Sequence, residues 1–105
     1  MGLTKASADY STQQVRIAEL AKALAHPARV AIVQYLLKTK ACVCGDLVDA
    51  LPLSQSTVSQ HLKAMKEAGI ITGSVEPPKV CYCLNPAVLM ELKAAFGNLF
   101  SSGCC

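Results

Sequence analysis

Residues 42–71, CVCGDLVDALPLSQSTVSQHLKAMKEAGII, carry the clearest structural pattern of the chain. Ser54 has the side chain to cap a helix over the residues that follow it, and Gly69 suits the left-handed conformation that ends many helices. One face of this helix is polar and nearly uncharged, and the opposite face is apolar. A short helix, a turn and a polar-faced second helix form the helix-turn-helix pattern, whose second helix enters the DNA major groove. The apolar residues of the second helix recur at the i, i+4, i+7 spacing of a buried stripe: Val58, Leu62 and Met65.

The segments on either side predict a mainly α (α+β) fold, a winged helix-turn-helix with additional N- and C-terminal dimerisation helices. Its wing is a two-stranded β-hairpin, and Pro86 opens the terminal helix. We expect residues 1–11 and the cysteine-containing tail 101–105 to be flexible, and residues 12–100 to form one DNA-binding and dimerisation domain. The expected ranges are 12–25 and 27–39 for the first two helices, 70–75 and 80–84 for the strands, and 86–100 for the last helix.

The composition indicates a partner for the apolar surface. Hydrophobic residues make up 52% of a chain of 105 residues, which is high for a small soluble monomer. The first and last helices carry most of the surplus, so we expect them to pair across a two-fold axis in a homodimer. The net charge of +3, doubled in the dimer, suits nucleic acid.

The six cysteines are expected to be reduced. Six in 105 residues is about 6%, below the roughly 8–10% of secreted disulfide scaffolds. Residues 1–14 contain no apolar run typical of a signal peptide, and no stretch is long and charge-free enough to span a membrane. We therefore expect a cytoplasmic protein whose thiols can bind metal. The sequence shows no catalytic triad, carboxylate pair or phosphate-binding glycine loop, so we do not expect an enzyme.

The C-V-C motif at Cys42 and Cys44 leads directly into the helix-turn-helix. In a regular helix, residues i and i+2 point to nearly opposite sides, so both thiols can hold one ion only where the helix start is distorted. Gly45 lowers the cost of such a distortion. Our hypothesis is that chelation reshapes this helix start and tilts the helix-turn-helix away from DNA. The alternative is that the two cysteines are small buried apolar residues.

Four segments of the chain resemble the ArsR/SmtB family of bacterial metal-responsive repressors, and its arsenic-responsive branch in particular. They are LAKALAHPARVAIVQYLL (20–37), CVC (42–44), SQSTVSQHLKAMKEAGII (54–71) and VCYCL (80–84). The resemblance implies a homodimer that binds double-stranded operator DNA and releases it when an inducer binds. It also implies which residues meet the DNA: Ser54, Gln55, Ser56, Thr57, Ser59, Gln60, His61 and Lys63 in the groove, and Lys79 on the wing.

The effector that the resemblance implies is trivalent arsenic or antimony, As(III) or Sb(III), with no permanent cofactor. These ions prefer sulfur ligands, and the thiolate is the binding form. Where the family's simplest arsenic pattern has a third cysteine, this chain has Leu47 or Val48. Cys81 and Cys83 share one face of a strand and can supply the third sulfur, although packing beneath the wing is the favoured interpretation for them. We expect the metal site to consist of Cys42, Cys44 and the tail residues Cys104 and Cys105.

Other interpretations stay open. The same repressor fold could respond to thiol oxidation or to a divalent soft metal such as cadmium, lead or zinc, since the sulfurs suffice for the four tetrahedral ligands of zinc. A zinc site on the last helix is not expected, because residues 86–100 contain neither Asp nor His. A thiol redox protein is disfavoured because both spaced pairs are C-x-C rather than C-x-x-C. A winged helix that contacts only proteins would lack salt-dependent binding to DNA.

Overall fold

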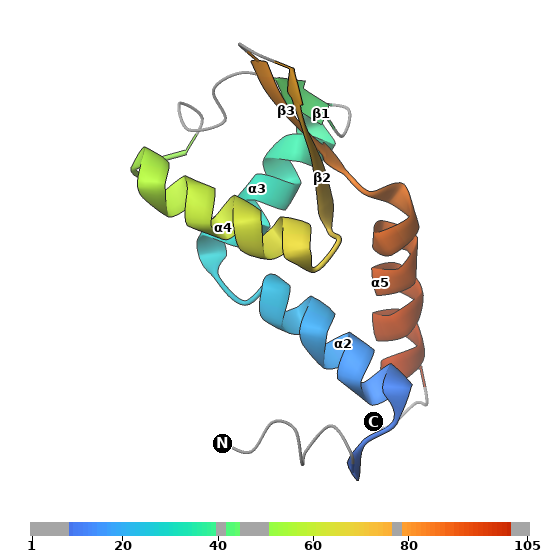
Figure 1. The fold of residues 1–105 in the computed structure, drawn as a ribbon. Coiled ribbons are helices and arrows are strands. Elements are labelled where there is room, and N and C mark those ends of the chain that lie inside the picture. Colours follow the sequence, from blue (N-terminus) through green and yellow to red (C-terminus); the bar gives the residue numbers. More distant parts are fainter. Residues whose placement is uncertain (1–8, 40–41, 45–50, 77–78, 102–105) are drawn as a thin grey trace.

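The computed structural model describes residues 9–39, 42–44, 51–76 and 79–101 (Figure 1). Within these ranges the chain forms four helices and one antiparallel sheet, which confirms the predicted mainly α (α+β) arrangement. The first helix of the predicted helix-turn-helix falls on residues 45–50, outside the described ranges. In chain order the elements are α2 (Thr12–Ala23), α3 (Pro27–Lys38), β1 (Cys42–Cys44), α4 (Gln55–Glu67), β2 (Ile71–Glu76), β3 (Lys79–Leu84) and α5 (Pro86–Leu99).

Each of these helices begins after a residue whose side chain accepts a hydrogen bond from a backbone N–H of the first turn. Ser11 completes a capping box at the start of α2. His26 caps α3 and Asn85 caps α5, and each precedes a proline, which needs no N–H partner at that position. Ser54 caps α4 as predicted. Gly69, with φ 86°, ends it in the left-handed region, which is also as predicted.

The core lies where α3 and α4 meet the sheet and the inner side of α2. The apolar stripe predicted for α4 is confirmed, since its members are all buried. Burying a Leu, Ile or Met side chain stabilises a fold by about 1.5–3 kcal/mol. The largest fully buried side chains are all aliphatic or Met: Leu20, Ile32, Leu36, Val58, Met65, Ile70 and Ile71.

The sheet differs from the predicted two-stranded hairpin because a third strand joins it. Strand β3 lies between β1 and β2, and its register places Cys83 opposite Cys42 and Cys81 opposite Cys44. Cys42 and Cys44 thus lie on a strand, which the sequence analysis does not predict. The physical reason is non-local: backbone groups of β1 find their partners on β3, and Val43 between the cysteines packs against the core.

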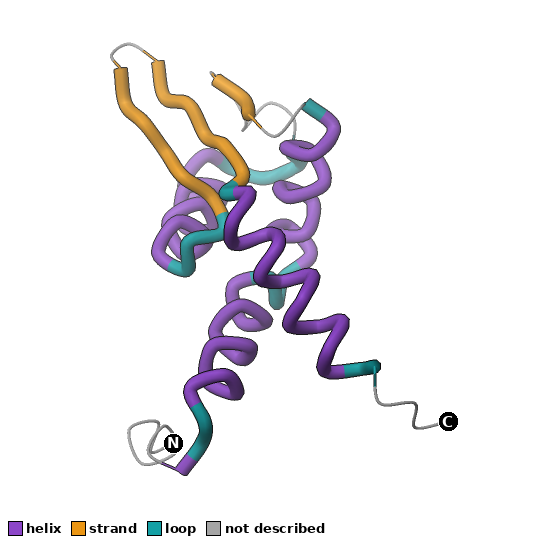
Figure 2. Tube along the Cα trace, turned by 90° about the vertical axis from the view of Figure 1, so that its right-hand side faces the viewer, coloured by secondary structure: helices purple, strands orange, loops and turns teal. Residues whose placement is uncertain are grey.

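Helices α2 and α5 extend toward the end of the molecule opposite the strands and contact each other (Figures 1 and 2). A bidentate ion pair joins them, with Arg16 Nε 2.7 Å from Glu91 Oε2 and Nη2 3.0 Å from Oε1. The Arg16 guanidinium holds the pKa of the Glu91 carboxyl below its ordinary value. In the described part of the chain, no helix is long and apolar enough to cross a membrane.

Candidate functional site

Helix α4 exposes a polar face. It contacts β2 of the hairpin (Figure 1). Ser54 is exposed at the start of the helix, and its Oγ lies 2.9 Å from Oγ1 of the half-buried Thr57. The side chain of Lys79 lies outside the described part of the chain. The exposed residues of the face are Gln55, Ser56, Ser59, Gln60 and Lys63.

His61 does not belong to this face. Only 9% of it is exposed, and it lies on the core side of α4. Arg29 of α3 donates a hydrogen bond from Nε to His61 Nδ1 at 3.0 Å, and the His26 ring packs against the His61 ring, tilted by 42°, with centroids 4.4 Å apart. This burial corrects the prediction that His61 lines the DNA groove. The residue instead links the start of α3 to the middle of α4.

The hydrogen bond from Arg29 requires a neutral imidazole at His61, because a protonated Nδ1 cannot accept. Burial lowers the pKa of His61, and its electrostatic interactions with the nearby His26 and Arg29 side chains lower it further. Arg29 is itself held by Nη1, which donates to the Lys22 carbonyl at the end of α2 at 3.3 Å. A single guanidinium thus joins α2, α3 and α4.

The cysteines of β1 and β3 lie on the outer face of the sheet. Successive residues of a strand point to opposite faces, and Val43 and Tyr82 pack against the core. Cys42, Cys81 and Cys83 therefore point the other way, and Cys42 is exposed. The interpretation that Cys81 and Cys83 pack beneath the wing is corrected by this placement.

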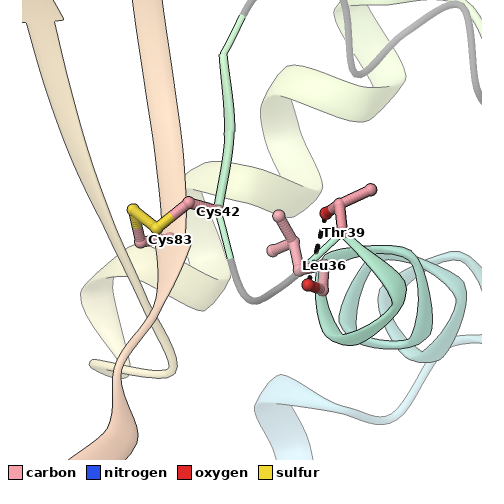
Figure 3. Close-up of a disulfide and its surroundings, with 4 residues drawn as sticks. All are labelled: Leu36, Thr39, Cys42 and Cys83. Atoms are coloured by element: carbon pink, nitrogen blue, oxygen red, sulfur yellow. Dashed lines mark hydrogen bonds between the residues drawn. A yellow bond between two sulfur atoms is a disulfide. The ribbon is translucent and has the colours of Figure 1, made fainter.

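A disulfide joins Cys42 to Cys83 on the side of β1 away from the end of α3 (Figure 3). Cys81 is disulfide-bonded as well, so these thiols, expected to be reduced, are oxidised in the structure. Among the described residues, no group of three or more His, Cys, Asp or Glu side chains is arranged to hold a metal ion. The predicted ligands Cys104 and Cys105 lie outside those residues, as does the side chain of Cys44.

Known proteins share both the sequence pattern and the fold. A family model described as "Bacterial regulatory protein, arsR family" matches residues 26–72. The HTH-type transcriptional repressor SmtB of Mycobacterium tuberculosis is 50% identical over 66 residues, which cover 63% of this chain and 48% of SmtB. The HTH-type transcriptional regulator CmtR of Mycobacterium bovis is 37% identical over 83 residues, covering 79% of this chain and 67% of CmtR. This chain belongs to the ArsR/SmtB family.

A crystal structure titled "Possible transcriptional regulator for arsenical resistance" superimposes on this ArsR/SmtB chain with a TM-score of 0.64. It is 29% identical and covers 78% of this chain and 83% of that one. The winged helix-turn-helix prediction is thereby confirmed, and the relatives are named as transcriptional regulators rather than enzymes. The chain spans about half the length of SmtB, the first curated relative it matches, at 48%.

Two features of this ArsR/SmtB protein escaped the sequence analysis. The contact of Arg29 with His61 joins residues from two helices, and the sequence AHPAR at residues 25–29 alone does not show what Arg29 contacts. The pairing of β1 with β3 was missed as well, although the sequence contains a signal for it. Two C-x-C motifs of equal spacing, at 42–44 and 81–83, match residue for residue when their strands run antiparallel.

Proposed function

We propose that this protein is a homodimeric transcriptional repressor that binds operator DNA through α4 and releases it when As(III) or Sb(III) binds its cysteines. The observation that carries the DNA-binding part is the exposed, nearly uncharged polar face of α4. Gln and Ser side chains can donate to and accept from base edges in the major groove. Lys63 at the same face suits a backbone phosphate.

The homodimer is supported by apolar surface at the free ends of α2 and α5. Leu99 and Phe100 are 51% and 76% exposed, and they continue the side of α5 that buries Leu92. A shallow groove of about 290 Å³ runs between the two helices. The radius of gyration is 15.5 Å, larger than the roughly 13 Å of a compact domain of this length. A second copy covering these helices would bury the surplus and present two copies of α4 to a two-fold site.

The arsenic or antimony effector is supported by the donor set. Cysteine thiolates are soft ligands and favour soft ions over oxygen-preferring ones such as magnesium. Cys42 and Cys44 lie on the strand that precedes the helix-turn-helix, so an ion bound there acts on the segment leading to α4. The possible transcriptional regulator for arsenical resistance described above shares this fold and is 29% identical to this chain.

Thiol oxidation is a second candidate signal, and the Cys42–Cys83 disulfide is the observation that favours it. Two thiols lose two protons and two electrons to an oxidant such as a peroxide, which is reduced to water. The bond that forms ties β1, ahead of the helix-turn-helix, to the wing strand β3. Oxidation and ion binding would then act on the same pair of strands.

Fluorescence anisotropy of a labelled duplex from upstream of the protein's own gene tests the proposal. Reduced protein should bind the duplex, and log affinity should fall linearly with log salt concentration. Arsenite or antimonite should release the duplex, whereas zinc should not. Release by peroxide alone would favour the second candidate. An absence of binding at every salt concentration would reject the DNA-binding function.

A matched pair of lysine variants locates the interface. Lys63→Ala should weaken binding and reduce the slope of the salt dependence by about 1 for each phosphate that the lysine neutralises. Lys93→Ala removes a positive charge that is also exposed, from α5, away from the proposed interface. It should leave the slope unchanged. Equal effects of the two variants would mean that α4 is not the DNA-binding surface.

A further inference from the structure

The outer face of the β1–β3 pair gathers cysteines from two distant parts of the sequence. Cys42 lies directly opposite Cys83, with Cα atoms 4.0 Å apart, and Cys81 precedes Cys83 by two positions on the same strand face. Residues at that spacing on a strand are about 7 Å apart, and opposite residues are about 5 Å apart at Cβ. The described cysteines therefore stand at three corners of a small rectangle, whose fourth position in the register is Cys44.

Packing does not account for this cluster. The core side of the same strands is filled by Val43 and Tyr82, and the cysteines, of which Cys81 and Cys83 are half-buried, are absent from that core. Cys42 is exposed, and Thr72, which faces Cys83 from β2, is exposed too. A small reductant or ion can therefore reach this face from solvent.

We infer that the reduced protein binds a thiophilic ion on this face, with Cys42, Cys81 and Cys83 as thiolate ligands. The register pairs Cys81 with Cys44 on β1. The inference rests on the proposed function and assigns its effector site to two strands of one subunit, without the tail residues Cys104 and Cys105. Three sulfurs suit trivalent arsenic or antimony, whereas divalent soft ions such as zinc take four tetrahedral ligands.

The disulfides of the structure prevent ion binding at this site, because a sulfur in an S–S bond is not available as a thiolate ligand. A low-molecular-weight thiol opens them by exchange: two of its molecules supply two electrons and two protons per disulfide and leave as their own disulfide. Each cysteine thiol then displaces one hydroxyl of arsenous acid, forming an As–S bond and releasing a water molecule. Oxidation and ion binding are therefore mutually exclusive at these sulfurs.

Thiol protection maps the site without reference to DNA. Reduced full-length protein is titrated with arsenite, alkylated with N-ethylmaleimide and digested, and the labelled peptides are quantified by mass spectrometry. We expect arsenite to protect Cys42, Cys81 and Cys83, and to leave Cys104 and Cys105 fully labelled. A parallel titration with cadmium should extend the protection to Cys44, because a divalent ion takes a fourth sulfur.

Matched variants measure the contribution of each thiol to arsenite affinity. Cys83→Ser removes a proposed ligand and should weaken arsenite binding by more than the roughly 10–100-fold that outer-shell changes cost. The double variant Cys104→Ser/Cys105→Ser removes two thiols from the tail and should bind arsenite like the unaltered protein. Circular dichroism checks that Cys83→Ser retains its helices, and Cys81→Ser provides an independent variant on the same strand.

Each result separates this site from the proposed function. Protection of the tail thiols, with unchanged arsenite affinity in Cys83→Ser and Cys81→Ser, would overturn the β1–β3 site while leaving a repressor possible. Protection of the strand thiols in a protein that never binds its upstream duplex would support the site and reject the repressor. Oxidised protein that binds arsenite as tightly as reduced protein would also overturn the inference.

Discussion

At the scale of single residues, the pair formed by Arg29 and His61 fixes α4 to the rest of the molecule. Arg29 bonds to His61 on α4 and to the Lys22 carbonyl at the end of α2, while it lies itself on α3. The His61 ring is buried against His26. A buried hydrogen-bonded group of this kind specifies one arrangement of its helices, since an unpaired partner would carry the full cost of desolvation.

The lowered pKa of His61 predicts a loss of stability in mild acid. Unfolded chains take up the histidine proton near the ordinary pKa of about 6.5, whereas the folded protein takes it up only at lower pH. The stability that the neutral His61 contributes is fully present above a pH of about 6.5, and it is lost as the pH falls toward the lower pKa of the folded protein. Thermal unfolding measured from neutral to mildly acidic pH should show this decline, and His61→Asn, which keeps an acceptor near the Nδ1 position, should flatten it. An unchanged pH profile in that variant would contradict the assignment.

Substitution by alanine should change the free energy of unfolding in opposite directions at two glycines. Gly69 has φ 86°, where a Cβ costs about 1–2 kcal/mol, so Gly69→Ala should lower the free energy of unfolding by roughly that amount. Gly97 lies inside α5 and a Cβ there would meet nothing within 4 Å. Gly97→Ala should therefore raise stability by about 0.5–1 kcal/mol. Urea denaturation of both variants tests the pair, and a shift in the same direction for both would be the contrary result.

At the scale of elements, the sequence predicts α4 well and β1 badly, for one physical reason. The start, end and buried stripe of α4 are specified by its own residues: Ser54 caps it, Gly69 ends it, and Val58 belongs to the stripe between them. Strand β1 is three residues long and exists only because β3, about forty residues later, offers its backbone groups. A helix signal is local, whereas the partner of a short strand is not.

The N-cap of α4 predicts a further difference between neighbouring serines. Ser54 Oγ accepts a hydrogen bond from the Thr57 N–H at 3.3 Å, and its removal in Ser54→Ala should cost about 1 kcal/mol of stability. Ser56 is exposed in the first turn, and its Oγ lies 3.3 Å from Ser54 Oγ but accepts from no backbone N–H among the described residues, so Ser56→Ala should cost only about 0.5 kcal/mol or less. Chemical denaturation followed by circular dichroism distinguishes them. Equal losses would show that the cap contributes nothing specific.

The same distinction between local and non-local signals applies to the candidate site. The polar face of α4 could be predicted because helical periodicity places its residues, and the structure removes only His61 from it. The arrangement of the cysteines could not, because it depends on which strands pair. The sequence of β3 alone favours packing for Cys83, and only the register with β1 places it opposite Cys42.

At the scale of the whole molecule, the exposed ends of α2 and α5 predict self-association. Phe100→Ser removes a side chain that is 76% exposed at the proposed dimer surface, and should shift the protein toward monomer in sedimentation equilibrium. Leu37→Ser removes a similarly apolar side chain, 56% exposed, from α3 and should leave the dimer intact. Should Leu37→Ser dissociate the dimer and Phe100→Ser not, the two-fold axis would have to pass near α3 instead.

The Cys42–Cys83 bond also changes the topology of the chain. It joins residues 41 positions apart, so α4 and β2 lie inside one covalent macrocycle. Closing a ring of that size restricts the unfolded chain, a stabilisation of about 4 kcal/mol in the chain-entropy treatment. A protease that cuts once within the ring opens the circle without dividing the molecule. In the oxidised protein α4, the helix proposed to bind DNA, therefore stays covalently linked on both sides of such a cut, and its release requires a thiol that reduces the disulfide.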